Sequence, residues 1–219
     1  MTVRTAVVIA VGPLGRGKSR LGPTLDPLAR RQLVLAMLDD VLRAVRVSHA
    51  GLVVVVTPDA EVDPLATTHG AAVVRDEGLG TNAAIVQALA DRRVRASDAA
   101  LVLQGDLPQL TGAQVAQLLN QLERATPPMA LLVPGDDGGT SALGLRPVDA
   151  LRTAFGPQSG AAHHQAADAA GIRLDELWID ELAADVDTTD DLERVRALVG
   201  PSTAAVLERI AVGAGGSEG

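Results

Sequence analysis

Cysteine is absent from this sequence of 219 residues, and aromatic side chains are almost absent. Phe155 and Trp178 are the only two, and there is no tyrosine. Without cysteine the chain has no disulfide framework, no zinc–thiolate site and no thiol nucleophile. Two aromatic side chains cannot build a platform on which nucleic-acid bases stack, nor an aromatic cage for a cation.

Long apolar runs and a positive net charge are also missing. No apolar run approaches the roughly 18–20 residues that span a bilayer. Gly12, Pro13 and Gly15 interrupt the first apolar stretch too early for a signal peptide. The formal net charge of −8 opposes general binding to nucleic acid. We therefore expect a cytoplasmic protein with no membrane segment and no nucleic-acid partner.

Lysine is the next scarce residue. Of the 19 basic residues 18 are arginine, and Lys18 is the one lysine. A chain that uses arginine almost everywhere favours a special use for a compact ammonium group at this position. The residues before Asp26 include Arg4, Arg16 and Arg20 but no acid, so an acidic protein begins with a cationic segment.

Short β-branched runs alternate with amphipathic segments along the chain. We expect strands at 5–11, 52–57, 72–74, 100–104, 129–133, 140–145 and 176–180. We expect helices at 26–45, 81–91, 111–124, 161–170, 189–199 and 202–211. Strands that are apolar on both faces predict an α/β fold with a mostly parallel central sheet and helices on both faces. Residues 1–212 would form one domain, and 213–219 a flexible, glycine-rich tail.

In such a sheet, ligands bind at the carboxyl ends of the strands. The loops that follow residues 11 and 104 both belong there. The first loop is cationic and rich in glycine, and the second presents the carboxylate of Asp106. This pair predicts an anionic substrate together with a divalent metal ion.

Residues 12–19 match the P-loop pattern GxxxxGK(S/T), and they follow a strand as a P-loop must. A P-loop also needs a helix that begins at its Lys-Ser pair, because the helix N-terminus holds the phosphates. Gly22-Pro23 blocks such a helix. We expect an open, extended loop to residue 25, and a P-loop NTPase or kinase as the alternative.

Several further segments accompany this loop in order. They are Lys18-Ser19-Arg20-Leu21, Leu38-Asp39-Asp40, Val56-Thr57-Pro58-Asp59, Gly80-Thr81-Asn82, Gln104-Gly105-Asp106-Leu107-Pro108, Gly139-Thr140-Ser141, Phe155-Gly156-Pro157-Gln158-Ser159 and the acidic run 185–191. In these segments the chain resembles, to about residue 205, the 2-phospholactate or phosphoenolpyruvate guanylyltransferases, which make the precursor of the deazaflavin coenzyme F-420. The resemblance implies a single-domain, Rossmann-like nucleotidyltransferase fold.

The resemblance also implies substrates and residue roles. GTP would donate GMP to a small phosphorylated carboxylic acid: 2-phospholactate, phosphoenolpyruvate or 3-phosphoglycerate. Nucleotide binding would involve Val11, Gly12, Pro13, Leu14, Arg16, Lys18, Gly80, Asn82, Gln104 and Gly105. Acceptor binding would involve Thr140, Ser141, Gly156 and Ser159. The family usually has lysine where this chain has Gly12, so we expect Arg16 to compensate or the affinity to fall.

The chemistry needs no general base, because a phosphate monoester with a second pKa near ~6 is already an anion at neutral pH. Catalysis would rest on positioning and charge neutralisation by Lys18, Arg20 and Asp106. Mg²⁺ would be the cofactor, with Asp106, Asp185 and Asp187 as candidate ligands. In an extended Asp-Val-Asp segment the two carboxylates share one face.

Simpler interpretations stay open for these residues. Asp106 could cap a turn, Asp185 and Asp187 could be acids at a helix N-terminus, and Asn82 could be a helix cap. We interpret His163-His164 as a surface pair on a helix. A nucleotidyltransferase of the molybdenum-cofactor type and a nucleotide-binding regulatory protein without turnover are further alternatives. The oligomeric state is also open, a homodimer included.

Overall fold

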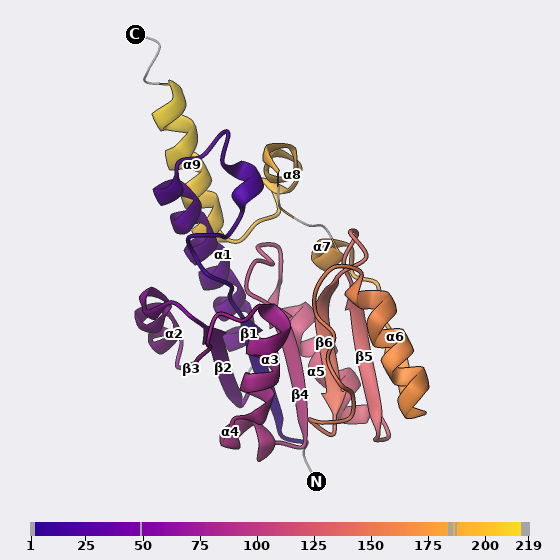
Figure 1. Ribbon diagram of the computed structural model, residues 1–219. Coiled ribbons are helices and arrows are strands. Elements are labelled where there is room, and N and C mark those ends of the chain that lie inside the picture. Colours follow the sequence, from indigo (N-terminus) through magenta and orange to yellow (C-terminus); the bar gives the residue numbers. More distant parts are fainter. Residues whose placement is uncertain (1–2, 49, 184–185, 187, 216–219) are drawn as a thin grey trace.

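The computed structural model describes residues 3–48, 50–183, 186 and 188–215. Within them, seven strands form one sheet in the order β3-β2-β1-β4-β6-β5-β7 (Figure 1). The strands are β1 (Thr5–Ala10), β2 (Leu52–Thr57), β3 (Ala72–Arg75), β4 (Ala99–Gln104), β5 (Met129–Pro134), β6 (Thr140–Arg146) and β7 (Arg173–Glu176). All neighbouring pairs are parallel except the two that include β6. The predicted mostly parallel sheet is confirmed.

The helices that the structure describes are α1 (Pro27–Val47), α2 (Asp63–Thr68), α3 (Thr81–Ala90), α4 (Arg92–Arg95), α5 (Gly112–Arg124), α6 (Ser159–Ala170), α7 (Asp180–Ala183), α8 (Thr189–Val195) and α9 (Pro201–Gly215). Four of them, α1, α4, α5 and α8, begin directly after a residue whose side chain caps the helix. Asp26 accepts a hydrogen bond from the Ala29 N–H at 2.8 Å, which caps α1. Thr111 and Gln114 form a capping box at the start of α5.

Helices cover both faces of the sheet, as expected (Figure 1). Because side chains alternate along a strand, Val7 and Ile9 of β1 pack on one face, against apolar residues of α1 and α5. Val8 packs on the other face, in a cluster that includes residues of α3 and α6. Each face of the sheet is therefore covered by its own apolar cluster, and the two clusters together position the loops at the edges of the sheet.

A third apolar cluster lies beyond the carboxyl edge of the sheet. It joins Leu21 and Leu25 of the first loop to Met37 of α1 and to residues of α8 and α9. Figure 1 shows α8, α9 and the beginning of α1 on this side of the molecule. Asp40 of α1 also accepts hydrogen bonds from the backbone N–H groups of Ser202 and Thr203, at 3.0 and 2.8 Å. The C-terminal helices thus support the first loop.

Three sequence-based expectations for local structure were wrong. The last strand is β7 (Arg173–Glu176) rather than 176–180. The backbone of these four mostly polar residues pairs with β5 at the edge of the sheet, whereas Trp178 lies beyond the strand and is 54% exposed. The first loop is not extended, since the N–H groups of Arg16 and Gly17 both donate to the Pro13 carbonyl, at 2.9 and 3.1 Å. Helix α9 also continues through 213–215, which we had assigned to the tail.

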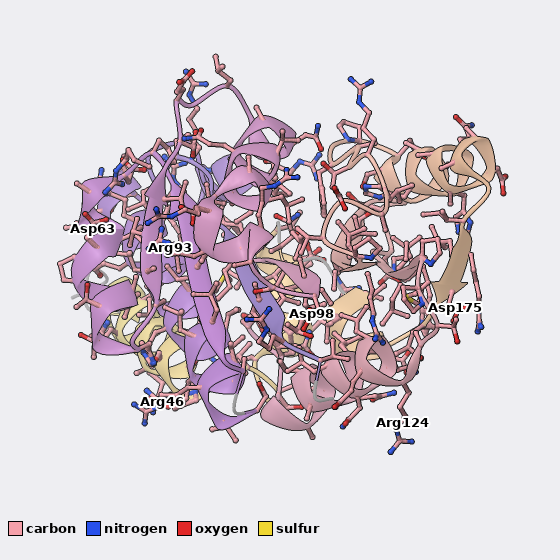
Figure 2. The ribbon with its side chains drawn as sticks, turned by 90° about the horizontal axis from the view of Figure 1, so that it is seen from below. Arg46, Asp63, Arg93, Asp98, Arg124 and Asp175 are labelled. Atoms are coloured by element: carbon pink, nitrogen blue, oxygen red, sulfur yellow. The ribbon has the colours of Figure 1, made fainter. Side chains whose placement is uncertain are left out.

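The opposite end of the molecule carries charges of both signs (Figure 2). Arg93, labelled there, is bound to Asp91 at 2.9 Å, and Asp175 is bound to Arg173 at 2.6 Å. Such local pairs indicate an ordinary solvated surface. In the part of the chain that the structure describes, no helix is both long enough and apolar enough to cross a membrane.

Candidate active site

Two adjoining cavities open at the carboxyl edge of the sheet, and both include Thr81. The larger, which we call the β6 cavity, has a volume of about 270 Å³, and its walls include Gln104, Asp106, Thr140, Ser141, Gly156 and Ser159. The smaller, which we call the β1 cavity, has walls that include Val11, Gly12, Pro13, Arg16, Asp76 and Gly80. The four residues predicted for the acceptor line the β6 cavity, and five of those predicted for the nucleotide line the β1 cavity. Gln104 lines the β6 cavity instead, and Leu14, Lys18, Asn82 and Gly105 line neither; the Leu14 side chain is buried in the core, where it cannot contact a nucleotide.

The reversed direction of β6 brings Thr140 and Ser141 to the site. Because β6 is antiparallel to β4, its first residues lie beside the end of β4, where Gln104 is the last strand residue and Asp106 lies in the loop that follows. The pairing with β5 shifts between Val133 and Pro134, which leaves Ser141 as an extra residue in β6. A bulge of this kind re-aims a side chain, and both consecutive hydroxyls line the β6 cavity.

Lys18 and Asp106 form the central ion pair. The Lys18 ammonium donates a hydrogen bond to Asp106 Oδ2 at 2.6 Å. The lysine side chain is only 3% exposed, whereas that of Asp106 is 40% exposed. Burial alone would raise the pKa of Asp106, but the charge and hydrogen bond of Lys18 outweigh it, so the pKa of this carboxyl lies below its ordinary value. Asp106 is therefore an anion at neutral pH.

The first loop holds Lys18 in this position by an unusual backbone conformation. Lys18 has φ of 51°, a left-handed conformation that non-glycine residues rarely adopt. Leu14 anchors the loop, because its side chain is buried in the core and its N–H donates to Asp59 Oδ2 at 2.6 Å. No α-helix begins at Lys18, where a single 3-10 turn (Ser19–Leu21) follows instead. This geometry does not fit a P-loop, whose helix must start at this point.

His163 is a site residue that we did not predict. It is fully buried, so our interpretation of His163-His164 as a surface pair was wrong for this residue; His164 is exposed and contacts Glu176. The signal was present in the sequence, since Ser159, His163 and Ala167 recur every four residues on one face of α6. Burial, and to a lesser degree the charge of His164, lowers the pKa of His163 to about 4.

The hydrogen bonds of His163 determine which way the neighbouring hydroxyl points its proton. His163 Nε2 accepts from the Ala154 N–H at 2.9 Å, so the ring proton is on Nδ1 and is donated to Thr140 Oγ1 at 3.1 Å. Thr140 Oγ1 also accepts from the Ser159 hydroxyl at 2.8 Å. Its lone pairs are then used, and its own proton is left to donate. A hydroxyl held as a donor in the β6 cavity suits an anionic ligand.

The segment around Gly156 forms another wall of the β6 cavity. Gly156 has φ of 147°, which other residues rarely adopt. The Phe155 N–H donates to Asn82 Oδ1 at 2.9 Å. The Asn82 side chain thus links α3 to the acceptor segment, and its predicted contact with the nucleotide stays a prediction. The N–H of Ser159 donates to the Gly156 carbonyl at 3.1 Å and its hydroxyl donates to Thr140 Oγ1, so Ser159 links the Gly156 segment to Thr140.

The remaining predicted residues occupy different surroundings. Arg20 is exposed in the 3-10 turn after Lys18. Gly105 packs against β1, because its N–H donates to the Ala10 carbonyl at 2.8 Å and a Cβ there would lie 2.7 Å from Val11 Cγ2. Asp185 and Asp187 lie outside the described residues. Val186 between them is buried in the same cluster as Leu21 of the first loop.

Asp106 is the described residue best suited to hold a metal ion. Among the residues that the structure describes, no group of three or more His, Cys, Asp or Glu side chains forms a complete metal site. Mg²⁺ is commonly bound through one or two carboxylates with substrate phosphates and water as further ligands. Two carboxylates, those of Asp106 and Asp137, line the β6 cavity. Asp137 Oδ1 already accepts a hydrogen bond from the Gly139 N–H at 2.7 Å, so the partly exposed carboxylate of Asp106 fits that pattern better.

Known proteins similar to this chain identify its family. Residues 5–206 match the family model described as "Guanylyl transferase CofC like". The phosphoenolpyruvate guanylyltransferase of Sphaerobacter thermophilus is 38% identical over 203 residues, covering 91% of this chain and 97% of the relative. That of Rubrobacter xylanophilus is 40% identical over 191 residues, covering 87% and 92%.

Solved structures show the same fold at low identity. A nucleotidyl transferase from Methanothermobacter thermautotrophicus superposes with a TM-score of 0.68 at 18% identity, covering 94% of this chain and 99% of that one. A CMP:2-keto-3-deoxy-manno-octonic acid synthetase solved with CTP has a TM-score of 0.59 at 19% identity, covering 89% and 98%. The fold is thus of the nucleotidyltransferase type. Because the family model matches most of its length, the chain belongs to the CofC-like family of guanylyl transferases and is a guanylyltransferase.

Proposed function

We propose that the enzyme transfers GMP from GTP to phosphoenolpyruvate and releases pyrophosphate, as a step in the biosynthesis of coenzyme F-420. The names of its relatives support phosphoenolpyruvate as the acceptor. The observation that carries the proposal is the pair of cavities that share Thr81, with the Lys18–Asp106 pair at the larger one. One space suits a nucleotide base, and the other suits a small anion.

The acceptor would bind in the β6 cavity. Thr140 would donate a hydrogen bond there, Ser141 adds a second hydroxyl, and Ser159 holds Thr140 in place by donating to its Oγ1. A small acid with a carboxylate and a phosphate matches these donors better than a neutral or cationic molecule does. With a pKa of about 4, His163 is too weakly basic to take a proton at physiological pH, and its Nε2 already accepts from the Ala154 N–H, so it would orient Thr140.

The reaction then needs positioning and charge neutralisation. An acceptor phosphate oxygen attacks the α-phosphorus of GTP, the bond from that phosphorus to the bridging oxygen breaks, and pyrophosphate leaves with the electron pair. No proton has to be removed from the nucleophile at neutral pH, because its second pKa is near ~6. Lys18 would stabilise the negative charge of the leaving group, with Arg16 and Arg20 nearby in the same loop.

We further propose that Mg²⁺ is required and that Asp106 is one of its ligands. Bound there with the substrates, the ion would neutralise charge on the phosphate oxygens. Asp185 and Asp187 remain the candidates for additional ligands. Asp106 would hold this position because the Lys18 ammonium fixes Oδ2, while a carboxylate has further lone pairs to offer.

The test is a pyrophosphate-release assay with Mg²⁺ and GTP, in which phosphoenolpyruvate, 2-phospholactate and 3-phosphoglycerate are supplied separately. We expect release that depends on an acceptor and is fastest with phosphoenolpyruvate. Mass spectrometry of the product should show the acceptor joined to GMP. Absence of release with every acceptor would contradict the proposal, and GDP formed without an acceptor would indicate a hydrolase instead.

A further inference from the structure

We propose that Asp76 selects guanine, by accepting hydrogen bonds from the base in the β1 cavity. This inference rests on the proposed function, since it assumes that a nucleotide occupies that cavity. Neither the sequence motifs nor the resemblance to the family assigned Asp76 a role. The carboxylate of Asp76 would be the group that distinguishes GTP from other nucleoside triphosphates.

The place of Asp76 in the fold is well defined. It follows β3 directly, and its N–H donates to the Thr57 carbonyl at 3.2 Å, so the pairing of β3 with β2 fixes its backbone. Its side chain is half-buried and lines the β1 cavity. Strand ends of this kind hold a side chain more rigidly than a long loop does.

The other walls of the cavity suit a planar base. Ala10, Val11, Pro13 and Ala84 are aliphatic, and Gly12, Gly78 and Gly80 have no side chain that would fill the space. Only Arg16 and Thr81 join Asp76 as polar side chains among these lining residues. A base enclosed here would be held by aliphatic contacts, and Asp76 would supply the one acceptor-only group.

Guanine is the base whose edge matches a carboxylate. Its N1–H and its N2 amino group are adjacent donors, and an ionised carboxylate presents two acceptor oxygens side by side. Adenine presents an unprotonated N1 at the corresponding position, so its lone pair would face the negative charge of Asp76. A site built to satisfy such donors discriminates against bases that lack them, because its buried acceptor is then left unpaired.

A purely structural role predicts a different result from substitution. Asp76 Oδ1 accepts a hydrogen bond from the Gly78 N–H, which shapes the turn before α3. An asparagine keeps a carbonyl oxygen that can accept the same bond. It replaces the second acceptor by an amide donor, however, and this arrangement fits xanthine, which has N1–H and a carbonyl oxygen at C2. Asp76→Asn therefore preserves the turn while it changes the base that is recognised.

The experiment measures kcat/KM for GTP, ITP, XTP and ATP with phosphoenolpyruvate and Mg²⁺, in the unmodified enzyme and in the full-length Asp76→Asn variant. We expect the unmodified enzyme to prefer GTP over ITP, which lacks the 2-amino group, and strongly over ATP. In Asp76→Asn, kcat/KM for GTP should fall by about 10- to 100-fold while that for XTP rises, so that XTP becomes the better substrate. Asp175→Asn, which makes the same charge change on the distant β7, should leave all four values unchanged.

The inference is overturned if the ratio of kcat/KM for GTP to kcat/KM for XTP is the same in Asp76→Asn as in the unmodified enzyme. Equilibrium binding of the four nucleotides without an acceptor, measured by calorimetry, separates this result from failure of the proposed function. If no acceptor supports turnover but Asp76→Asn still shifts binding from GTP towards XTP, the acceptor assignment fails and the role of Asp76 is supported. An unshifted binding preference would reject the role of Asp76.

Discussion

The Lys18 ammonium lies 2.6 Å from Asp106 Oδ2, although the two residues are 88 positions apart in the sequence. The pair joins the first loop to the loop after β4 at the carboxyl edge of the sheet. The left-handed backbone of Lys18 is sparsely populated by residues with a Cβ, and it persists because Leu14 and the turns around it hold the loop. Such local strain is commonly found where a side chain has a functional position to keep.

Removal of the ammonium is the first test of this arrangement. We expect Lys18→Ala to lower kcat by about 100- to 1000-fold, because a preorganised charge near the transferring phosphoryl group is lost. The measurement is pyrophosphate release with saturating GTP and phosphoenolpyruvate. Arg46→Ala, at the end of the molecule shown in Figure 2, is the control for loss of one positive charge. A rate like that of the unmodified enzyme in Lys18→Ala would refute the role of this lysine.

The pKa of His163 predicts a pH dependence of stability. Its value in the folded state is about 4, whereas an ordinary histidine in the unfolded chain has a pKa of about 6.5. Between these values the unfolded chain binds more protons than the folded protein, so the free energy of unfolding falls as the pH is lowered. The loss across this window should be on the order of 3 kcal/mol.

Urea melts between pH 7 and pH 4 test this expectation. His163→Gln removes the titration but keeps a donor and an acceptor, so its stability should depend less on pH within the window. His164→Gln removes an exposed histidine from the same helix and serves as the control. His163→Gln should also raise the KM for the acceptor more than it lowers kcat, because His163 orients Thr140 and does not transfer a proton. Equal pH dependence in all three proteins would contradict the assigned pKa.

The sequence was sufficient to predict the sheet and most of the residues at its carboxyl edge. Short β-branched apolar runs such as 52–57 favour buried strands, and parallel strands bring the loops after β1 and β4 together regardless of their separation in the chain. This is why Lys18 and Asp106 could be placed in one site from sequence alone. The position of β7 was missed because an edge strand needs few apolar residues, and Arg173–Glu176 has only Leu174.

Other features depend on contacts that no local pattern contains. The bulge at Ser141 arises from the register between β5 and β6. Asp76 after a short strand resembles an ordinary turn residue, and its significance depends on which loops surround it. His163 could have been recognised by its spacing from Ser159, but only if α6 was known to bury that face.

Close packing at Gly105 leads to a prediction about stability. A Cβ at this position would lie 2.7 Å from Val11 Cγ2 and 3.0 Å from the Ala10 carbonyl oxygen. Because backbone cannot move aside easily, Gly105→Ala should lower the free energy of unfolding by about 1–3 kcal/mol. It should also lower turnover, since Asp106 is the next residue. Gly51→Ala, where a Cβ meets nothing within 4 Å, is the matched control in the urea melts. Equal stability of the two variants would show that the loop adjusts.

The open surroundings of Gly12 allow a test of the lysine that the family resemblance leads us to expect at this position. A Cβ at Gly12 meets no atom within 4 Å, and Gly12 lines the β1 cavity together with Arg16. Gly12→Lys should add a cation near the nucleotide phosphates and stabilise the complex by about 1 kcal/mol, which is a roughly fivefold lower KM for GTP.

Gly15→Lys makes the same charge change at an equally open position outside the walls of that cavity. If both variants lower the KM equally and salt abolishes the effect, the gain is general attraction of the triphosphate. A lower KM in Gly12→Lys alone would show that Arg16 compensates only in part for the missing lysine.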